Sequence, residues 1–380
     1  MPITRRNILR KFAAGAASAA ALRAFGELGF AQARPAENRS VSAGPLVLSR
    51  NENPYGPSPK VLAAMREAAA RANRYPAGEY DTLTRKLAAL HRVHPEQIVL
   101  GCGSSELLRM AAETFLGPGK KFVQASPTFP LPGEVARNTG ADVISVALNS
   151  RHEHDLEMML ARSDASTALV YVCNPNNPTG TITPRAEIQG FIAKLPAKTM
   201  VLVDEAYHEF AGQSKAYASF LDRPLDDHRV IVTRTFSKVH GLAGMRIGYA
   251  VASPEAARRL SAGHLTLGVG VISARAAAAA LDDPDYAALA ARRNAADRQE
   301  FRNQINARMM RAIDSHTNFV MLDPRRPVEE VFAHLQKNNV QIGPPAPEMS
   351  KYLRVSLGTP EEMLQFWKIW DLMPVGKMAM

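Results

Sequence analysis

The feature that most constrains the fold is a succession of short apolar runs, rich in β-branched residues, in the middle of the chain. Several of these runs lack the alternation of apolar and polar residues that a half-exposed strand shows. Such runs are typical of strands buried on both faces of a mostly parallel sheet, with helices above and below. They occupy residues 98–100, 122–125, 143–147, 168–173, 200–203, 230–233 and 247–251. The fold class they predict is α/β, with a mostly parallel seven-stranded sheet.

Helical patterns separate the apolar runs. In residues 59–74, Ser58 can cap the N-terminus and Pro59 takes the first-turn position, and residues 104–116 form a second pattern. After about residue 273 the sequence becomes rich in Ala and Arg, and short strand-like pieces follow at 318–322 and 352–356. We therefore predict a large domain over residues 59–273, a smaller α+β domain over 274–380, and an arm over 34–58 that joins the small domain.

The first 33 residues are typical of a targeting segment. Arg5 and Arg6 open a cationic region, an apolar run over residues 12–22 follows, and a small-x-small sequence ends at Ala33. This pattern resembles a twin-arginine export signal, which predicts cleavage after Ala33 and a periplasmic or exported enzyme. The alternative is an amphipathic N-terminal helix of a cytoplasmic enzyme. No other apolar stretch reaches the roughly 18 residues of a membrane helix, so we expect no stable membrane insertion.

The charge balance argues against a nucleic-acid partner. Lys and Arg number 46 against 36 Asp and Glu, a net charge of +10, of which +4 falls within the first 33 residues. The remaining excess is spread thinly, without a block of cations interleaved with aromatic residues. We expect no metal site, because two cysteines and the scattered histidines make no ligand set. Cys102 and Cys173 lie in or beside apolar runs, and we expect both as buried free thiols.

Polar residues follow four of the apolar runs, where ligands bind in open parallel sheets. Asp204 comes directly after one run, and a buried carboxylate needs a cation or hydrogen-bond donors. Residues 232–248 place hydroxyls, Lys238 and Arg246 around a Gly-rich turn, which suits a phosphate beside an amine nucleophile. Residues 174–180 form a rigid turn that can present an amide, and residues 101–106 form a glycine turn that enters a helix.

The order of these motifs resembles that of the fold-type I pyridoxal-phosphate enzymes, and within them the class I/II aminotransferases of the histidinol-phosphate aminotransferase type. The resemblance covers nearly the whole chain after the targeting segment. The motifs that carry it are at residues 51–59, 74–76, 174–180, 204–207, 235–248 and 352–359. It implies the fold-type I architecture, pyridoxal 5'-phosphate as cofactor, and a homodimer with a shared active site.

The resemblance also assigns the catalytic residues. Lys238 would form the covalent imine with the cofactor aldehyde and then serve as the general base. Asp204 would pair with the pyridinium nitrogen, and Tyr207 would hydrogen-bond the phenolic oxygen of the cofactor. Arg354 would grip the α-carboxylate of the substrate, with an ordinary surface salt bridge as the alternative for this arginine.

The remaining implied residues hold the cofactor. Asn177 would share the phenolic oxygen with Tyr207, and Phe129 would stack on the pyridine ring, where tyrosine is usual in the family. Tyr55 would reach the phosphate of the neighbouring subunit. The phosphate site of the same subunit would be formed by Ser104, Ser105, Thr235, Ser237 and Arg246.

The implied reaction moves an amino group from an α-amino acid to a 2-oxo acid such as 2-oxoglutarate by a ping-pong route. A histidinol-phosphate or an aromatic donor fits the resemblance. The sequence departs from the family at residues 130–133 and at Val239-His240, which leaves the donor open, and we expect His240 to pack beside the lysine loop. The alternatives are a decarboxylase or lyase on the same scaffold, or a non-catalytic exported binder.

Overall fold

The computed structural model describes residues 44–212, 214–222, 227–263 and 267–374. The described residues from Leu46 onward form one unit, and every contact reported below lies within it. The proposed export signal over residues 1–33 lies outside the described residues. None of the helices in the described ranges is long and apolar enough to cross a bilayer.

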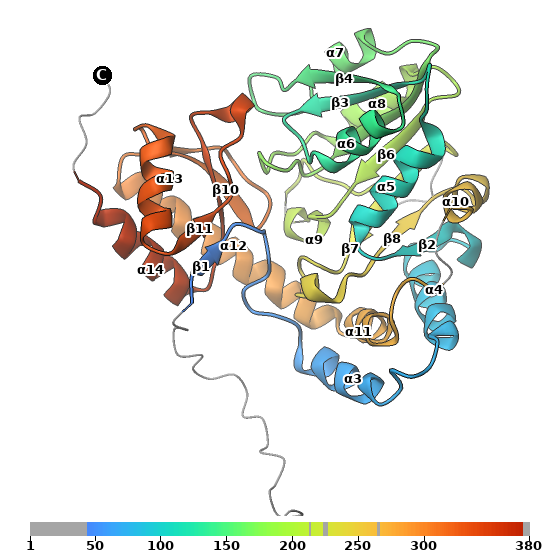
Figure 1. The fold of residues 1–380 in the computed structure, drawn as a ribbon, viewed down its shortest axis with the longest axis horizontal. Helices are drawn as coiled ribbons and strands as arrows, with labels where there is room; N and C mark the ends of the chain where they lie inside the picture. The colour runs from blue at the N-terminus through green and yellow to red at the C-terminus, as the bar shows by residue number, and fades with distance from the viewer. Residues whose placement is uncertain (1–43, 213, 223–226, 264–266, 375–380) are drawn as a thin grey trace, which may run out of the picture. The chain divides into compact units, whose positions relative to one another are not determined.

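A seven-stranded sheet dominates the described part of the chain (Figure 1). Its spatial order is β2-β8-β7-β6-β5-β3-β4, and only β8 runs antiparallel to its neighbours. The strands are β2 (Ile98–Gly101), β3 (Lys121–Ser126), β4 (Asp142–Ala147), β5 (Thr167–Cys173), β6 (Met200–Asp204), β7 (Val230–Thr235) and β8 (Gly248–Val251). Each predicted apolar run corresponds to one of these strands, and the predicted α/β class is confirmed.

Both faces of this sheet are buried under helices, which explains why the strand sequences lack alternation. Along β5, Val170 and Val172 point into one apolar core, while Leu169 and Tyr171 point into the other. The first core also contains residues of α3 (Pro59–Ala69), α4 (Ala77–His91), α7 (Leu156–Ala161), α8 (Arg185–Lys194) and α11 (Val271–Leu281). The second contains residues of α5 (Ser104–Phe115), α6 (Leu131–Asn138) and α10 (Pro254–Ser261).

Helix α3 begins where the sequence predicts. The Ser58 hydroxyl accepts a hydrogen bond from the backbone N–H of Val61, and Pro59 occupies the first turn. The helix ends at Ala69 rather than at residue 74. Beyond it the chain tightens into turns, with the N–H groups of Ala70, Arg71 and Ala72 bonded to carbonyls three residues back. Pro76 then excludes a continuous helix into α4, because proline disfavours helical backbone in the residue before it.

Two small sheets and three helices form the second region, coloured orange and red in Figure 1 apart from the blue strand β1. Strand β1 (Leu46–Leu48) pairs in parallel with β11 (Val340–Ile342), and Leu46 and Leu48 enter the apolar core of this region. The antiparallel sheet has the order β12-β10-β9. The other elements are β9 (Arg311–Ala312), β10 (Phe319–Asp323), β12 (Leu353–Ser356), α12 (Pro284–Ala307), α13 (Val328–Lys337) and α14 (Pro360–Asp371).

The short elements lie in the connections between these layers. They are α9 (His208–Ala211) and the 3-10 turns η1 (Pro95–Gln97), η2 (Ala243–Met245) and η3 (Pro347–Met349). Helix α12 contacts α9 and α11 of the first region and β9 and β10 of the second. The ends of β6 and β7 and strand β12 contribute residues to the same cavity. The division into domains at residues 33, 58 and 273 stays a prediction.

Candidate active site

A cavity of about 510 Å³ opens where the parallel strands end. Every predicted site residue except Tyr55 lines it, and no other lysine is among its lining residues in the described chain. The predicted residues on its wall are Ser104, Ser105, Phe129, Asn177, Asp204, Tyr207, Thr235, Ser237, Lys238, Arg246 and Arg354. The fold therefore brings together side chains that are spread over 250 positions of the sequence.

Asp204 is the last residue of β6 and is almost fully buried. The Tyr171 hydroxyl donates to its Oδ2 at 3.1 Å, and the Thr233 hydroxyl donates to its Oδ1 at 3.1 Å. Burial raises the pKa of Asp204 to about 6, and these two hydrogen bonds oppose the rise. The sequence analysis missed Tyr171 and Thr233. Both lie on strands beside β6, and Thr233 is the register partner of Asp204 on β7.

Lys238 follows β7 and extends toward the N-terminal segment. Its Nζ donates to the carbonyl oxygen of Asn51 at 2.9 Å and to that of Arg50 at 3.3 Å. The ammonium lies 5.5 Å from the centre of the Tyr207 ring. Burial, followed by the charge of Arg354, lowers the pKa of Lys238 to about 8. A fraction of the amine is therefore neutral, and nucleophilic, near physiological pH.

The predicted phosphate site combines a cation with hydroxyls and backbone amides. The Thr235 hydroxyl donates to the Oγ of Ser237 at 2.9 Å, and the Arg246 guanidinium donates to the Ala243 carbonyl oxygen at 2.9 Å. Ser104 and Ser105 open helix α5, whose first amides have no acceptor within the helix. Gly103, at φ +79°, leaves room for Arg246, because a Cβ at this glycine would overlap the guanidinium.

Arg354 lies on β12, across the cavity wall from the large sheet. Its Nη1 donates to the Oδ1 of Asn177 at 2.7 Å and its Nη2 to the carbonyl oxygen of Ser49 at 2.8 Å. Its Nε is buried and lacks a hydrogen-bond partner, and no acidic side chain of the described residues forms an ion pair with this arginine. A half-buried guanidinium without a carboxylate suits an anionic ligand better than a surface salt bridge.

Two residues of the wall, Tyr207 and Arg354, contact Phe319, which does not itself line the cavity. The edge of the Tyr207 ring meets Phe319 of β10, with ring centres 5.2 Å apart, and Arg354 lies over the same Phe319 ring. Phe319 is a third residue that the sequence analysis missed, because an apolar strand residue gives no sign of a site. Thr128, which precedes Phe129, donates to the Oδ1 of Asn176 at 2.8 Å. This bond fixes the turn that carries Phe129 to the turn that carries Asn177.

Tyr55 stands apart from this cavity. Its hydroxyl donates to the Oδ2 of Asp297 at 2.8 Å, and the Arg293 guanidinium lies 5.1 Å from the centre of its ring. Within one chain Tyr55 therefore does not contribute to the site, and its predicted service to a neighbouring subunit stays a prediction. His240 packs against Phe236, with ring centres 5.1 Å apart, as expected for a residue beside the lysine loop.

The two cysteines differ in exposure. Cys173 is buried at the end of β5 and lines the cavity, and burial raises the pKa of its thiol. Cys102 is an exposed free thiol. The expectation that both are buried is wrong for Cys102, because it lies in the turn between β2 and α5, outside the apolar cores. No group of three or more potential metal ligands gathers among the described residues.

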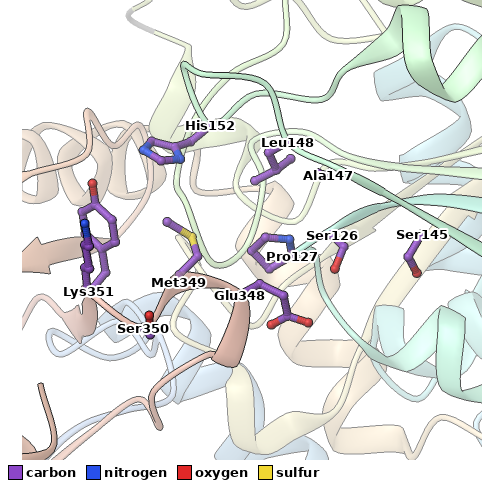
Figure 2. Close-up of a pocket in the computed structure, with 11 residues that line it drawn as sticks. Ser126, Pro127, Ser145, Ala147, Leu148, His152, Glu348, Met349, Ser350 and Lys351 are labelled. Atoms are coloured by element: carbon purple, nitrogen blue, oxygen red, sulfur yellow. The ribbon is translucent and has the colours of Figure 1, made fainter.

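A second cavity of about 520 Å³ lies between the ends of β3 and β4 and the loop before β12. His152 lies on the wall of this cavity (Figure 2). Its ring meets that of Tyr352 edge-on, with ring centres 5.7 Å apart. The charges on its wall, Lys351 and Glu348, cancel. This cavity shares no lining residue with the first, and its lining includes no buried carboxylate and no arginine, both of which the first cavity has.

The residues of the first cavity fit pyridoxal phosphate. Arg246, the hydroxyls and the α5 amides suit its phosphate, the buried carboxylate of Asp204 suits a protonated ring nitrogen, and Lys238 suits the aldehyde. The family model of aminotransferases of class I and II matches residues 43–368, so the chain belongs to this family. The protein is accordingly an aminotransferase that uses pyridoxal phosphate.

Individual relatives agree with this assignment. The chain is 38% identical over 330 residues to histidinol-phosphate aminotransferase 2 of Methylococcus capsulatus, covering 85% of this chain and 89% of the relative. Among solved structures, a histidinol-phosphate aminotransferase of Sinorhizobium meliloti in complex with pyridoxal-5'-phosphate has a TM-score of 0.80 at 29% identity, covering 86% of this chain and 91% of that one. A similar protein from Erwinia carotovora atroseptica has a TM-score of 0.83 at 34% identity, with coverage of 86% and 95%.

Proposed function

We propose that this aminotransferase takes the amino group from a donor that combines a planar ring with an anionic group, and passes it to a 2-oxo acid such as 2-oxoglutarate. Histidinol phosphate and the aromatic α-amino acids are the donors of this class. The observation that carries the proposal is the placement of Lys238, Asp204 and the unpaired Arg354 on the wall of one cavity. The names of the relatives support histidinol phosphate as the first donor to test.

The proposed roles follow from the environment of each side chain. Pyridoxal phosphate, when bound, supplies an aldehyde carbon and a ring that accepts electrons from the substrate. Lys238 would remove the proton from the Cα of the donor and return it two atoms along, to the carbon that the cofactor aldehyde supplies. This role requires a neutral amine, and burial lowers the pKa of Lys238 to about 8. The ionised carboxylate of Asp204 would hold the protonated ring nitrogen of the cofactor, and the hydrogen bonds from Tyr171 and Thr233 favour this ionised form.

Arg354 explains how one site can serve two different substrates. Histidinol phosphate carries a phosphate ester where glutamate carries its α-carboxylate, and a guanidinium binds either anion through two parallel hydrogen bonds. Nη1 of Arg354 donates to Asn177 and Nη2 donates to the Ser49 carbonyl oxygen, and these hydrogen bonds fix the plane of the guanidinium. Because no acidic side chain of the described residues neutralises Arg354, its charge is available to the ligand.

A donor screen tests the reaction. Purified protein loaded with pyridoxal phosphate is incubated with histidinol phosphate, phenylalanine, tyrosine or histidine, and the absorbance of the pyridoxamine form is followed. Glutamate that appears on addition of 2-oxoglutarate supports the proposal. Release of carbon dioxide without that absorbance change assigns the scaffold to decarboxylation, and a lack of any change with all donors contradicts the proposal.

We propose further that the enzyme is a homodimer in which Tyr55 serves the partner's site. Support comes from the resemblance over residues 51–59 and from the position of Tyr55 outside the cavity of its own chain. Mixing Tyr55→Phe with Lys238→Ala chains tests this idea. If Tyr55 serves the partner's site, a mixed dimer has one site that carries both changes and one site that carries neither. Cofactor binding recovered at the unchanged site therefore supports sharing. A monomeric protein by light scattering contradicts it.

We also propose that the N-terminal segment directs export through the twin-arginine route. Arg5, Arg6 and the small residues up to Ala33 are its support. Replacement of both arginines by lysine is expected to retain the protein in the cytoplasm, and N-terminal sequencing of the exported protein is expected to begin after Ala33. A mature protein that begins at Met1 contradicts export. A confirmed export would favour aromatic α-amino acids over histidinol phosphate, which is a cytoplasmic intermediate.

A further inference from the structure

Asn51 occupies a special position in the N-terminal segment. It belongs to the motif at residues 51–59, but neither the sequence analysis nor the proposed mechanism gives it a role. It is 2% exposed, and its φ of 54° lies in the left-handed region, which asparagine adopts more readily than most residues. A buried polar residue in this conformation needs partners for all its polar atoms.

Two of these atoms reach the catalytic residues. The carbonyl oxygen of Asn51 accepts the hydrogen bond from Lys238 Nζ at 2.9 Å, and its Nδ2 donates to the Tyr207 hydroxyl oxygen at 3.1 Å. The donation occupies a lone pair of the phenol, which leaves the hydroxyl hydrogen for another acceptor. Since Tyr207 lines the cavity, a ligand bound there can accept this hydrogen.

The other atoms of Asn51 reach the strand that carries Arg354. The N–H of Asn51 donates to the Ser356 Oγ at 2.9 Å, and the Ser356 hydroxyl donates back to the Oδ1 of Asn51 at 2.9 Å. Asn318 donates to the Asn51 carbonyl oxygen at 3.0 Å. Ser356 and Arg354 lie two residues apart on β12. One residue therefore joins the amine of Lys238 and the phenol of Tyr207 to the strand of the anion-binding arginine.

We propose that Asn51 is a positioning residue, whose carbonyl oxygen holds the Lys238 amine whenever this amine is not bonded to the cofactor, while its carboxamide orients the Tyr207 hydroxyl and ties both to β12. This inference rests on the proposed roles of Lys238 and Tyr207. In the half of the reaction cycle in which the Lys238 amine is free, its position then depends on Asn51 in the N-terminal segment. A backbone acceptor suits this task because it binds the amine without adding a negative charge that would raise its pKa.

Variants of Asn51 test the proposal. Asn51→Gly keeps the left-handed backbone and the carbonyl oxygen but removes the contacts to Tyr207 and Ser356. Asn51→Asp keeps the acceptor for Ser356 but replaces the donor to Tyr207 with a charge. The readout is the pH midpoint of the absorbance change of the bound cofactor, which depends on the hydrogen bond that Tyr207 donates. We expect this midpoint to rise by about one unit in both variants, because the phenol becomes a weaker donor.

A second readout needs no catalysis. In the cofactor-free protein, the pH dependence with which an amine reagent labels Lys238 reports the pKa of the lysine directly. Asn51→Asp is expected to raise this pKa by about one unit, while Asn51→Gly is expected to leave it near that of the wild type because the carbonyl oxygen remains. Both readouts survive a failure of the donor screen, so a wrong substrate assignment and a wrong role for Asn51 are distinguishable.

Two further variants complete the test, the first as a control and the second as a probe of the tie to β12. Asn53→Ala changes a neighbouring asparagine that bonds the Val239 carbonyl oxygen, away from the cavity wall, and is expected to keep the wild-type midpoint. Ser356→Ala removes the tie to β12 and is expected to raise KM for the substrate anion more than it lowers kcat. Folding is checked by thermal unfolding of each variant. Folded Asn51 variants with wild-type midpoints in both readouts would overturn the proposal and leave Asn51 with a packing role alone.

Discussion

The Tyr171 hydroxyl donates to the Asp204 carboxylate at 3.1 Å, and both residues are buried on the neighbouring strands β5 and β6. The hydrogen bond stabilises the ionised form of Asp204, whose pKa burial raises to about 6. Tyr171→Phe removes this donor and is expected to raise the pKa by about one further unit, so more of the carboxyl is protonated at neutral pH. The kcat at pH 7 should fall and recover as the pH rises.

The control for this change is Tyr217→Phe. Tyr217 is also buried, but its hydroxyl contacts the Nδ1 of His208 at 3.1 Å rather than a cavity residue. Its kcat profile against pH is expected to match that of the wild type. If kcat of Tyr171→Phe falls on the acidic side at the same pH as kcat of the wild type, this hydrogen bond does not hold Asp204 ionised.

Removal of the lysine amine is expected to abolish covalent attachment of the cofactor. Lys238→Ala should lose borohydride-stable labelling and at least about a thousandfold in kcat, since it lacks both the nucleophile and the base. Peptide mapping of the reduced wild-type protein measures the attachment site. Lys351→Ala, on the wall of the second cavity, is the control and should label normally. Label on any other lysine of the wild type would refute the assignment.

Cofactor loading is expected to depend on pH through Lys238. The pKa of this amine is about 8, below the usual value of 10.5, so the amine loses its proton as the pH rises through 8. Only the neutral amine attacks the aldehyde, and the loading rate should therefore increase from pH 6 to pH 9 with a midpoint near the lysine pKa. Stopped-flow absorbance of the cofactor-free protein measures this rate. A rate that falls over the same range would contradict the assigned pKa direction.

For substrate binding, the planar guanidinium geometry of Arg354 is expected to matter more than its positive charge. Arg354→Lys keeps the positive charge but cannot hold Asn177, the Ser49 carbonyl oxygen and a substrate anion together. We expect KM for the 2-oxo acid to rise about tenfold to a hundredfold, which corresponds to the loss of a charged hydrogen bond. Arg109→Lys, in an exposed pair with Glu113 on α5, is the matched control. Equal KM values for the two variants would remove Arg354 from the substrate site.

The glycine turn before α5 is expected to control cofactor affinity. Gly103→Ala places a methyl group against the Arg246 guanidinium and forces alanine into left-handed backbone. Displacement of Arg246 should weaken binding of pyridoxal phosphate about tenfold or more, because it loses a charge-assisted contact. Equilibrium dialysis measures the affinity. Gly190→Ala, on α8 with no atom within 4 Å of the added methyl, should bind normally and be slightly more stable.

Much of the site could be predicted because strand order places the ends of parallel strands along one edge. Asp204, Lys238 and Asn177 each follow a buried run, and each lines the cavity. Their chemistry is visible in the sequence as a polar residue where an apolar run stops. Helix α3 shows the limit of such patterns, since its start at Ser58 was correct and its end was five residues too late.

The sequence by itself determined the class of the fold, since runs without alternation require a sheet covered on both faces, and it determined the side chains that can react. The tertiary structure alone decided which groups adjust those side chains. Tyr171 and Thr233 reach Asp204 through strand register, and Asn51 reaches Lys238 from 187 positions away in the chain. Hydrogen bonds act over about 3 Å, and a linear sequence does not record which distant atoms folding brings within that range.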